Sequence, residues 1–226
     1  MKLKSKKLFN SKKRVFWEAL LITVAVFMMG LLSGVAFENN RLADMNEYYA
    51  KSEVNLMDSL AMKDFLSRED NDLTCEQARK YNVKFANKIY NESLKLSDYE
   101  QRNKITDQIK IAHQKYDMLR TFLWMNNRDL RNRCGNYSYV VYLYNYSSKD
   151  LGEKAENKVW SRILFDLKEK HGNDVVLIPI AANSDLISLE AMISNYNIEE
   201  YPVVIIDDNV VIRELEGVDK LEKHIY

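Results

Sequence analysis

The sequence has few of the residues that interrupt helices or cross-link small domains: six Gly, two Pro and two Cys among 226 residues. So little Gly and Pro excludes a collagen-like chain or a disordered linker, and two Cys exclude a disulfide-dense secreted scaffold. The formal net charge is zero, so the chain as a whole does not attract an anionic partner. Its length suits one or two domains with a buried core.

The zero net charge hides two oppositely charged parts. Residues 1–14 hold seven bases and no acid: Lys2, Lys4, Lys6, Lys7, Lys12, Lys13 and Arg14. The remaining chain carries seven more acids than bases, because the two totals are equal at 33. We expect no nucleic-acid partner, since this basic cluster lies beside an apolar segment and suits membrane orientation or anionic lipid headgroups.

Residues 15–37 form a long apolar segment whose only charged residue is Glu18. As a helix it spans about 35 Å, enough to cross a hydrocarbon core of about 30 Å. The positive-inside rule predicts that residues 1–14 are a cytoplasmic tail and that everything after Phe37 lies outside the cytoplasm, on a single-pass protein of the cell membrane. A cleaved signal peptide is the alternative, because Gly34 and Ala36 fit a small-residue cleavage site. We favour an uncleaved signal anchor, because the run exceeds a signal core of about 7–15 residues.

Residues 38–134 are predicted to form an all-α, coiled-coil stalk, because residues 38–133 contain neither Gly nor Pro. We expect a first helix at about 40–67. A second helix is expected to follow Thr74, with Gln77 at capping-box spacing from it. A turn at 91–97 would then lead to a third helix at 98–131. The first of these would carry an apolar face of Leu42, Met45, Tyr49, Leu56 and Leu60. The last has apolar residues at coiled-coil spacing, interrupted by Asn126: Ile105, Ile109, Ala112, Tyr116, Leu119, Leu123 and Leu130.

Gly30 and Gly34 have the GxxxG spacing that lets two membrane helices approach closely. A homodimer through these glycines and the stalk is therefore one expectation, although small residues are common in membrane helices.

The two cysteines, Cys75 and Cys134, are expected to form one intramolecular disulfide, because thiols outside the cytoplasm are usually paired. Two free thiols or an intermolecular bridge are the alternatives. In a straight hairpin turning near residue 95, Cys75 would face residue 115, about 28 Å from Cys134 at the helical rise. Pairing then requires a bend, for which Asn126–Asn127 is the expected place. The cysteine spacing matches no zinc or redox motif.

Residues 135–226 have the pattern of one compact α/β domain. Strands are predicted at 139–144, 175–180, 203–207 and 210–215, and an Asp208–Asn209 turn joins the last two. Helices are predicted at about 155–171, at 185–195 with Ser184 as cap, and from residue 219. The order is β-α-β-α-β-β-α.

This order, together with YNIEEYPVVIID at 196–207, resembles the thioredoxin fold over about residues 137–226. The residues at the family's positions are Tyr196, Ile198, Pro202, the Asp208–Asn209 turn and Gly217. The whole chain is also similar to membrane-anchored prokaryotic proteins in which a helical stalk precedes an exported thioredoxin-like domain. The resemblance implies a cis-proline at Pro202. It also implies a peptide groove formed by Tyr201, Pro202 and Val203 beside the loop 147–154.

The family's CxxC motif is absent here. Its expected place holds Lys154, Ala155, Glu156 and Asn157. Without a sulfur nucleophile, thiol–disulfide exchange cannot take place at this position. Cys134 precedes the first strand and cannot replace the motif. Charged residues that open a helix are usually solvated, so Lys154 and Glu156 are not interpreted as an acid–base pair.

No catalytic residue, metal site or cofactor is expected, because His113, His171 and His224 are isolated in the sequence. The sequence thus predicts a redox-inactive thioredoxin-like module that binds an unknown protein or peptide, or acts as a scaffold, outside the cytoplasm. The alternatives are a disulfide oxidoreductase that uses Cys75 and Cys134, and a purely structural oligomeric stalk.

Overall fold

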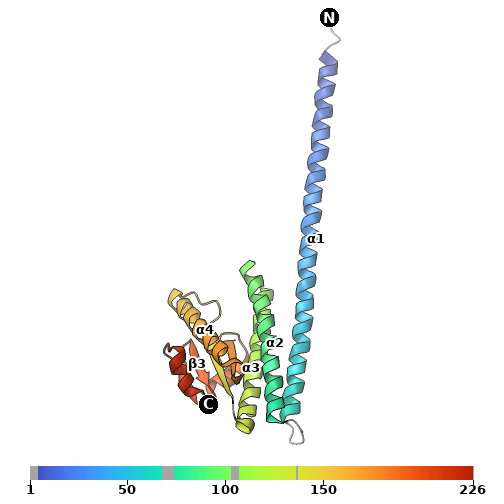
Figure 1. Ribbon diagram of the computed structural model, residues 1–226. Coiled ribbons are helices and arrows are strands. Elements are labelled where there is room, and N and C mark those ends of the chain that lie inside the picture. Colours follow the sequence, from blue (N-terminus) through green and yellow to red (C-terminus); the bar gives the residue numbers. More distant parts are fainter. Residues whose placement is uncertain (1–4, 68–73, 103–106, 136, 226) are drawn as a thin grey trace. The chain divides into compact units, whose positions relative to one another are not determined.

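The structure, a computed structural model, describes residues 5–67, 74–102, 107–135 and 137–225 (Figure 1). The chain forms two compact units, Met1–Lys51 and Ser52–Tyr226. The first helix, α1 (Ser5–Ser67), contains the apolar segment Lys13–Phe37. This segment has a mean hydropathy of 2.4, and all of its residues are exposed. The predicted apolar helix is therefore present, and its length and composition suit either a signal anchor or a signal sequence.

Helix α1 is continuous, whereas the sequence predicted a membrane helix to Phe37 and a separate helix at about 40–67. No Gly or Pro separates the two segments, so the helical hydrogen bonds continue between them. Of the apolar face expected after residue 40, Leu60 is exposed. The side chains of the other four members lie outside the described residues: Leu42, Met45, Tyr49 and Leu56.

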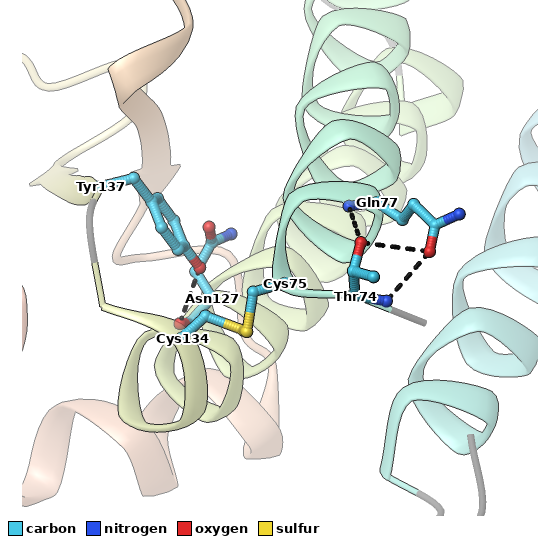
Figure 2. The surroundings of a disulfide bond; sticks show 6 residues. All are labelled: Thr74, Cys75, Gln77, Asn127, Cys134 and Tyr137. Atoms are coloured by element: carbon cyan, nitrogen blue, oxygen red, sulfur yellow. Dashed lines mark hydrogen bonds between the residues drawn. A yellow bond between two sulfur atoms is a disulfide. The ribbon is translucent and has the colours of Figure 1, made fainter. Parts of the chain in front are cut away.

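Helices α2 (Cys75–Arg102) and α3 (Asp107–Cys134) pack antiparallel, with the first residue of α2 bonded to the last residue of α3 (Figure 2). The predicted Cys75–Cys134 disulfide is confirmed, with Cα atoms 5.4 Å apart.

Two predictions about this hairpin are wrong. Helix α2 continues through 91–97 to Arg102, because its polar residues fit a helix: the Ser93 hydroxyl donates to the Tyr90 carbonyl one turn back. The predicted 98–131 helix is accordingly replaced by the end of α2 and by α3. Since α2 ends at Arg102 and α3 begins at Asp107, the two cysteines come opposite each other without a bend at Asn126–Asn127. Both of these asparagines are buried in α3.

Helix α2 begins with the predicted capping box (Figure 2). The Thr74 N–H donates to Gln77 Oε1 at 2.9 Å, and the Gln77 N–H donates to Thr74 Oγ1 at 3.3 Å. These bonds satisfy donors that have no carbonyl partner within the helix. The start of α2 is thereby fixed next to Cys75, which holds the disulfide at the end of the helix.

The C-terminal region contains a mixed four-strand sheet in the order β2-β1-β3-β4. Strand β1 is parallel to β2 and antiparallel to β3, and β3 is antiparallel to β4. The elements follow in the predicted order: β1 (Ser138–Tyr144), α4 (Leu151–His171), β2 (Val175–Ala181), α5 (Ile187–Ser194), β3 (Val203–Ile206), β4 (Val210–Ile212) and α6 (Val218–Leu221). Helix α5 follows the N-cap Leu186, which makes no side-chain cap bond, so the expected capping by Ser184 is wrong.

Helices pack on both faces of the sheet, which explains why β1 reads as a continuous apolar run rather than an alternating one. On one face, Val140 and Tyr142 of β1 join a core with Trp160 and Leu164 of α4 and Leu221 of α6. Helix α3 packs against β1 and β2, and the alternate β1 residues on its side, Tyr139, Val141 and Leu143, are fully buried.

The heptad seam predicted for a coiled coil is part of this core. Six of its residues are buried: Ile109, Ala112, Tyr116, Leu119, Leu123 and Leu130. The seventh, Ile105, lies outside the described residues. A 3.5-residue period shows that one helix face is covered but not what covers it. Here α2 and the sheet cover it, and α3 belongs to the same compact unit as the sheet.

The outer edge of β2 is protected at two positions against pairing with another strand. The Ala182 N–H donates to Tyr144 of β1, so the alternate residues Leu177, Pro179 and Ala181 direct their N–H positions away from β1. Pro179 has no N–H, and the Ala181 N–H donates to the Asp117 carboxylate of α3 at 3.1 Å. Two of these three positions therefore offer no N–H to an added strand, which disfavours strand pairing at this edge.

Candidate functional site

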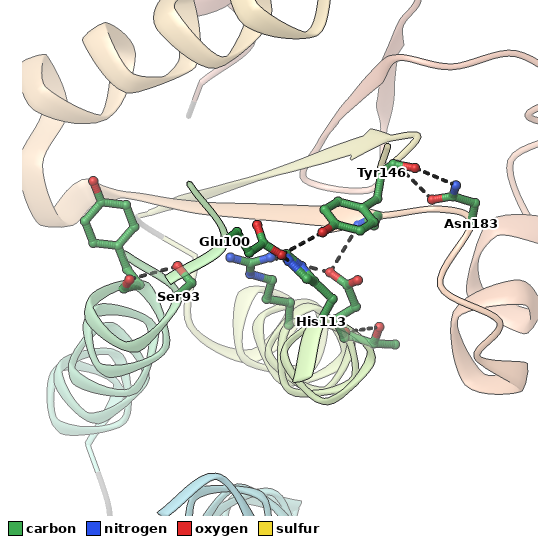
Figure 3. A network of polar contacts seen from close by, with 10 residues as sticks. Ser93, Glu100, His113, Tyr146 and Asn183 are labelled. Atoms are coloured by element: carbon green, nitrogen blue, oxygen red, sulfur yellow. Dashed lines mark hydrogen bonds and ion pairs between the residues drawn. The ribbon is translucent and has the colours of Figure 1, made fainter. Parts of the chain in front are cut away.

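The parallel strands β1 and β2 end side by side, with Tyr144 paired to Ala181. In open α/β sheets, ligands bind outside the carboxyl ends of such strands. The two loops that follow are joined here: the Tyr146 N–H donates to Asn183 Oδ1 at 2.8 Å, and Asn183 Nδ2 donates to the Tyr146 carbonyl at 3.0 Å (Figure 3). This pair of bonds holds the two loops against each other at the carboxyl ends of β1 and β2.

A pocket of about 540 Å³ lies between these loops and α3. Its volume falls within the range of small-molecule sites in proteins. Polar side chains from both sides line it, among them His113, Gln114, Asp117, Tyr146, Asn183 and Ser184. The pocket is therefore framed by a helix and by two joined loops.

Glu100 in the last turn of α2, His113 in α3 and Tyr146 in the loop after β1 form a network beside the pocket (Figure 3). The Tyr146 hydroxyl donates to Glu100 Oε1 at 2.6 Å, and His113 Nε2 contacts the same oxygen. The rings of His113 and Tyr146 lie 4.1 Å apart between centroids. Burial pushes the pKa of Glu100 upward, but the hydrogen bonds with His113 and Tyr146 outweigh it and leave that pKa below its ordinary value.

Asp117 lies at the buried side of the pocket, with a side chain 1% exposed. Its Oδ1 accepts from the Ala181 N–H at 3.1 Å and from Arg120 Nη1 at 3.4 Å. Burial raises the pKa of this carboxyl, and Arg120 and the Ala181 N–H oppose that rise. Asp117 Oδ2 is also buried and, among the residues that the structure describes, has no hydrogen-bond partner.

Ser184 and Gln114 complete the polar side of the pocket. Gln114 Nε2 donates to the Ser184 carbonyl at 2.9 Å and so ties the loop after β2 to α3. The Ser184 hydroxyl is buried and has no hydrogen-bond partner within the described part of the chain. Two unpartnered oxygens thus belong to residues that line one pocket.

The residues expected to form a peptide groove lie at the same edge of the sheet. Val203 pairs with Leu143, next to the carboxyl end of β1, and the Tyr201–Pro202 peptide bond is cis. Pro202 and Val203 are buried and Tyr201 is partly exposed. None of the three lines the pocket described above.

Lys154, Ala155, Glu156 and Asn157 lie inside α4, not at its start. The helix begins at Leu151, and Asp150 caps it by accepting from the Gly152 and Glu153 N–H groups. Asn157 Oδ1 accepts from the Tyr142 hydroxyl at 3.0 Å, so its contact is with the core strand β1. None of these four residues lines the pocket.

Sequence reasoning missed the network and the pocket. It treated His113 as isolated, because its partners Glu100 and Tyr146 stand on other elements at no regular spacing. One local signal was present: His113, Asp117 and Arg120 follow one another at spacings of four and three, beside the apolar seam of α3. Such spacing places three ionisable side chains on one line of the helix.

Fold and pocket define only a broad class: a chain with an N-terminal apolar helix, further helices and an α/β region with a mixed four-strand sheet. No protein-family model, curated protein or solved structure matches this chain. Within the described ranges, no group of three or more His, Cys, Asp or Glu side chains is arranged to hold a metal ion.

Glu100→Gln is expected to destabilise the protein at pH values well above 4.5, the ordinary pKa of this carboxyl, and to lose that effect as the pH falls below it. A carboxyl whose pKa is lowered by folding stabilises the folded state when ionised, and protonation removes the stabilisation. The measurement is urea unfolding of both proteins across this pH range.

The exposed Glu214, which lies after β4 and outside any helix, offers a matched control. Glu214→Gln should leave the unfolding free energy almost unchanged across this pH range. An effect of Glu100→Gln that is equal at acidic and neutral pH would contradict the assigned network.

Proposed function

We propose that the chain is a single-pass, membrane-anchored protein whose C-terminal region is a thioredoxin-like binding module outside the cytoplasm. The apolar segment Lys13–Phe37, which follows the seven basic residues of the N-terminal tail, supports this anchor and orientation. The element order from β1 to α6 and the parallel β1–β2 pair support the thioredoxin-like assignment.

The observation that carries a binding function rather than a redox function is the absence of sulfur at the start of α4. Both cysteines of the sequence are consumed in the Cys75–Cys134 disulfide, which joins the ends of α2 and α3. The Tyr201–Val203 segment stands at the same sheet edge as the loops after β1 and β2. A module that keeps this end of the sheet but lacks the thiols retains a surface for binding a polypeptide. It does not retain the thiols that thiol–disulfide exchange requires.

Tyr201→Ala in the full-length, membrane-embedded protein is expected to abolish the recovery of specific protein partners after mild detergent extraction and tag purification. The partly exposed ring is the side chain through which this segment meets an extended peptide in the proposed groove. The measurement is quantitative mass spectrometry of the co-purified proteins.

Tyr81→Ala is the matched control, because Tyr81 is an exposed tyrosine of α2, 43% accessible. Partners lost with Tyr201→Ala and kept with Tyr81→Ala support the proposal. Recovery of the same partners with the wild type and with Tyr201→Ala would contradict the proposed peptide groove.

A second candidate is disulfide exchange through Cys75. This residue is exposed, it is the first residue of α2, and a pocket of about 270 Å³ is lined by both cysteines. A helix N-terminus favours a thiolate and so a reactive cysteine. Turnover in an insulin-reduction assay that is abolished by Cys134→Ser would favour this candidate over the binding module.

A further inference from the structure

Another pocket, of about 490 Å³, lies between the first turns of α2 and the 3₁₀ turn η1 (Gly172–Asp174), which follows α4. Its volume is also within the range of small-molecule sites in proteins. Arg79 of α2 lines it and forms an ion pair with Asp174 of η1, with Nη1 and Oδ1 3.1 Å apart. This contact joins residues 95 positions apart, so the pocket is a product of tertiary packing within the unit Ser52–Tyr226.

The charged side chains that line this pocket are mostly basic. Lys80 and Lys84 line it together with Arg79, and Glu76 is the acidic residue of the lining. Arg79 is neutralised by Asp174, whereas Lys80 and Lys84 have no ion-pair partner among the residues that the structure describes. When Glu76 is counted against one of the two lysines, the pocket still keeps an excess of positive charge, which attracts an anion.

This positive charge is local to the first half of α2. The chain after residue 14 carries seven more acids than bases, yet residues 75–91 hold four bases and one acid. Lys80, Lys84 and Lys88 follow one another at four-residue spacing, and all three are exposed. Like charges at this spacing repel one another on a helix surface. An anion bound beside them would relieve that repulsion.

The hydrogen-bond donors of the lining suit an anion with several acceptor oxygens. A lysine ammonium donates hydrogen bonds and accepts none, and it is a common phosphate ligand in proteins. Asn87 of α2 and Asn173 of η1 add side-chain amides from the two walls of the pocket, and each amide can donate. A terminal phosphate group has three acceptor oxygens and about two negative charges near neutral pH. It therefore matches two unpaired lysines and two amides better than a carboxylate, which has fewer oxygens and one charge.

We propose that the pocket between α2 and η1 binds a terminal phosphate group, held by Lys80 and Lys84 and by the amides of Asn87 and Asn173. The group belongs either to free phosphate or to a phosphomonoester on a larger molecule, and both present the same oxygens. This site goes beyond the proposed polypeptide groove, because the segment Tyr201–Val203 does not line it. Binding here requires neither the groove nor a thiol.

The test is a phosphorus NMR titration of inorganic phosphate with the full-length protein in dodecyl maltoside, at neutral pH and low ionic strength. Saturable line broadening is expected, and equimolar acetate should not displace the phosphate. Lys84→Gln should weaken binding about tenfold, as loss of one charge-assisted hydrogen bond predicts, and Lys80→Gln should act in the same way. Lys158→Gln is the matched control and should leave binding unchanged, because this exposed lysine of α4 does not line the pocket.

A second titration, with glycerol 3-phosphate, distinguishes the two sources of the phosphate group. Binding equal to that of inorganic phosphate would assign the site to the phosphate group alone. Tighter binding that is lost in Lys84→Gln would assign it to a phosphomonoester on a larger molecule.

Three outcomes overturn the proposal: no saturable binding of inorganic phosphate, equal binding by the wild type and both lysine variants, or displacement of phosphate by equimolar acetate. An equal loss of binding with Lys158→Gln would also contradict it, because attraction to overall charge would then suffice. Lys80 and Lys84 are exposed and unpaired within the described ranges, so neither variant should lower the thermal midpoint. Tyr201→Ala should leave phosphate binding intact, so failure of the polypeptide groove and failure of this site are distinguishable.

Discussion

Replacing both Cys75 and Cys134 by serine is expected to lower the unfolding free energy of the protein by about 4 kcal/mol. The bond joins residues 59 positions apart, so its removal frees a long loop in the unfolded chain. It also joins the first residue of α2 to the last residue of α3. The loss of stability affects the helices and the sheet together, because α3 packs on the sheet and supplies much of its core.

The measurement is urea unfolding of the full-length protein in mild detergent, followed by circular dichroism. Reducing agent should lower the stability of the wild type by a similar amount and leave the double serine variant unchanged. Mass spectrometry should show no alkylated thiol before reduction and two after it. A double variant as stable as the wild type would show that the bond does not clamp the folded unit.

Trp124→Ala is expected to cost about 3–5 kcal/mol, the range for truncating a large buried aromatic side chain. Trp124 is fully buried in α3, its Nε1 donates to Asp208 Oδ1 at 2.9 Å, and its ring stacks on Tyr196 with centroids 5.7 Å apart. It therefore joins α3 to the turn between β3 and β4 and to the segment after α5.

This variant distinguishes an integral α3 from an independent stalk. If α3 were a separate stalk, Trp124→Ala would leave the unfolding of the sheet unchanged. An integral α3 instead gives one cooperative transition at lower urea for helices and strands together. Trp124→Phe should cost less, because an aromatic ring still fills the site and Asp208 keeps its ion pair with Arg128 at 3.0 Å. Tyr81→Ala, at an exposed site, should have little effect.

Local signals in the sequence predicted the elements of the fold well. Thr74 and Gln77 form the capping box that their spacing indicates, and α4 ends at His171, where the sequence predicts its end. The order of strands and helices after residue 135 is also the predicted one. These features depend on residues within a few positions of one another, so a linear pattern contains them.

Tertiary contacts could not be predicted in the same way. The turn expected at 91–97 failed, because polar residues alone do not end a helix when no Gly or Pro is present. The seam of α3 was correctly expected to be covered, but a period cannot distinguish another chain from this chain's own α2 and sheet. The candidate site was missed for a related reason: Asp117 meets Ala181 across 64 positions, and Tyr146 meets Glu100 across 46.

The sequence by itself determined the asymmetry of the chain: a basic tail, an apolar helix long enough to cross a membrane, and an acidic remainder with two cysteines that pair. Composition and short spacings suffice for the tail and the helix, because each depends on neighbouring residues, and two cysteines allow only one intramolecular pairing. Only the tertiary structure decided that α3 is a layer on the sheet and that Asp117 and Ser184 line one pocket. Those facts depend on which surfaces meet when distant segments pack, and packing leaves no periodic trace in the residues between them.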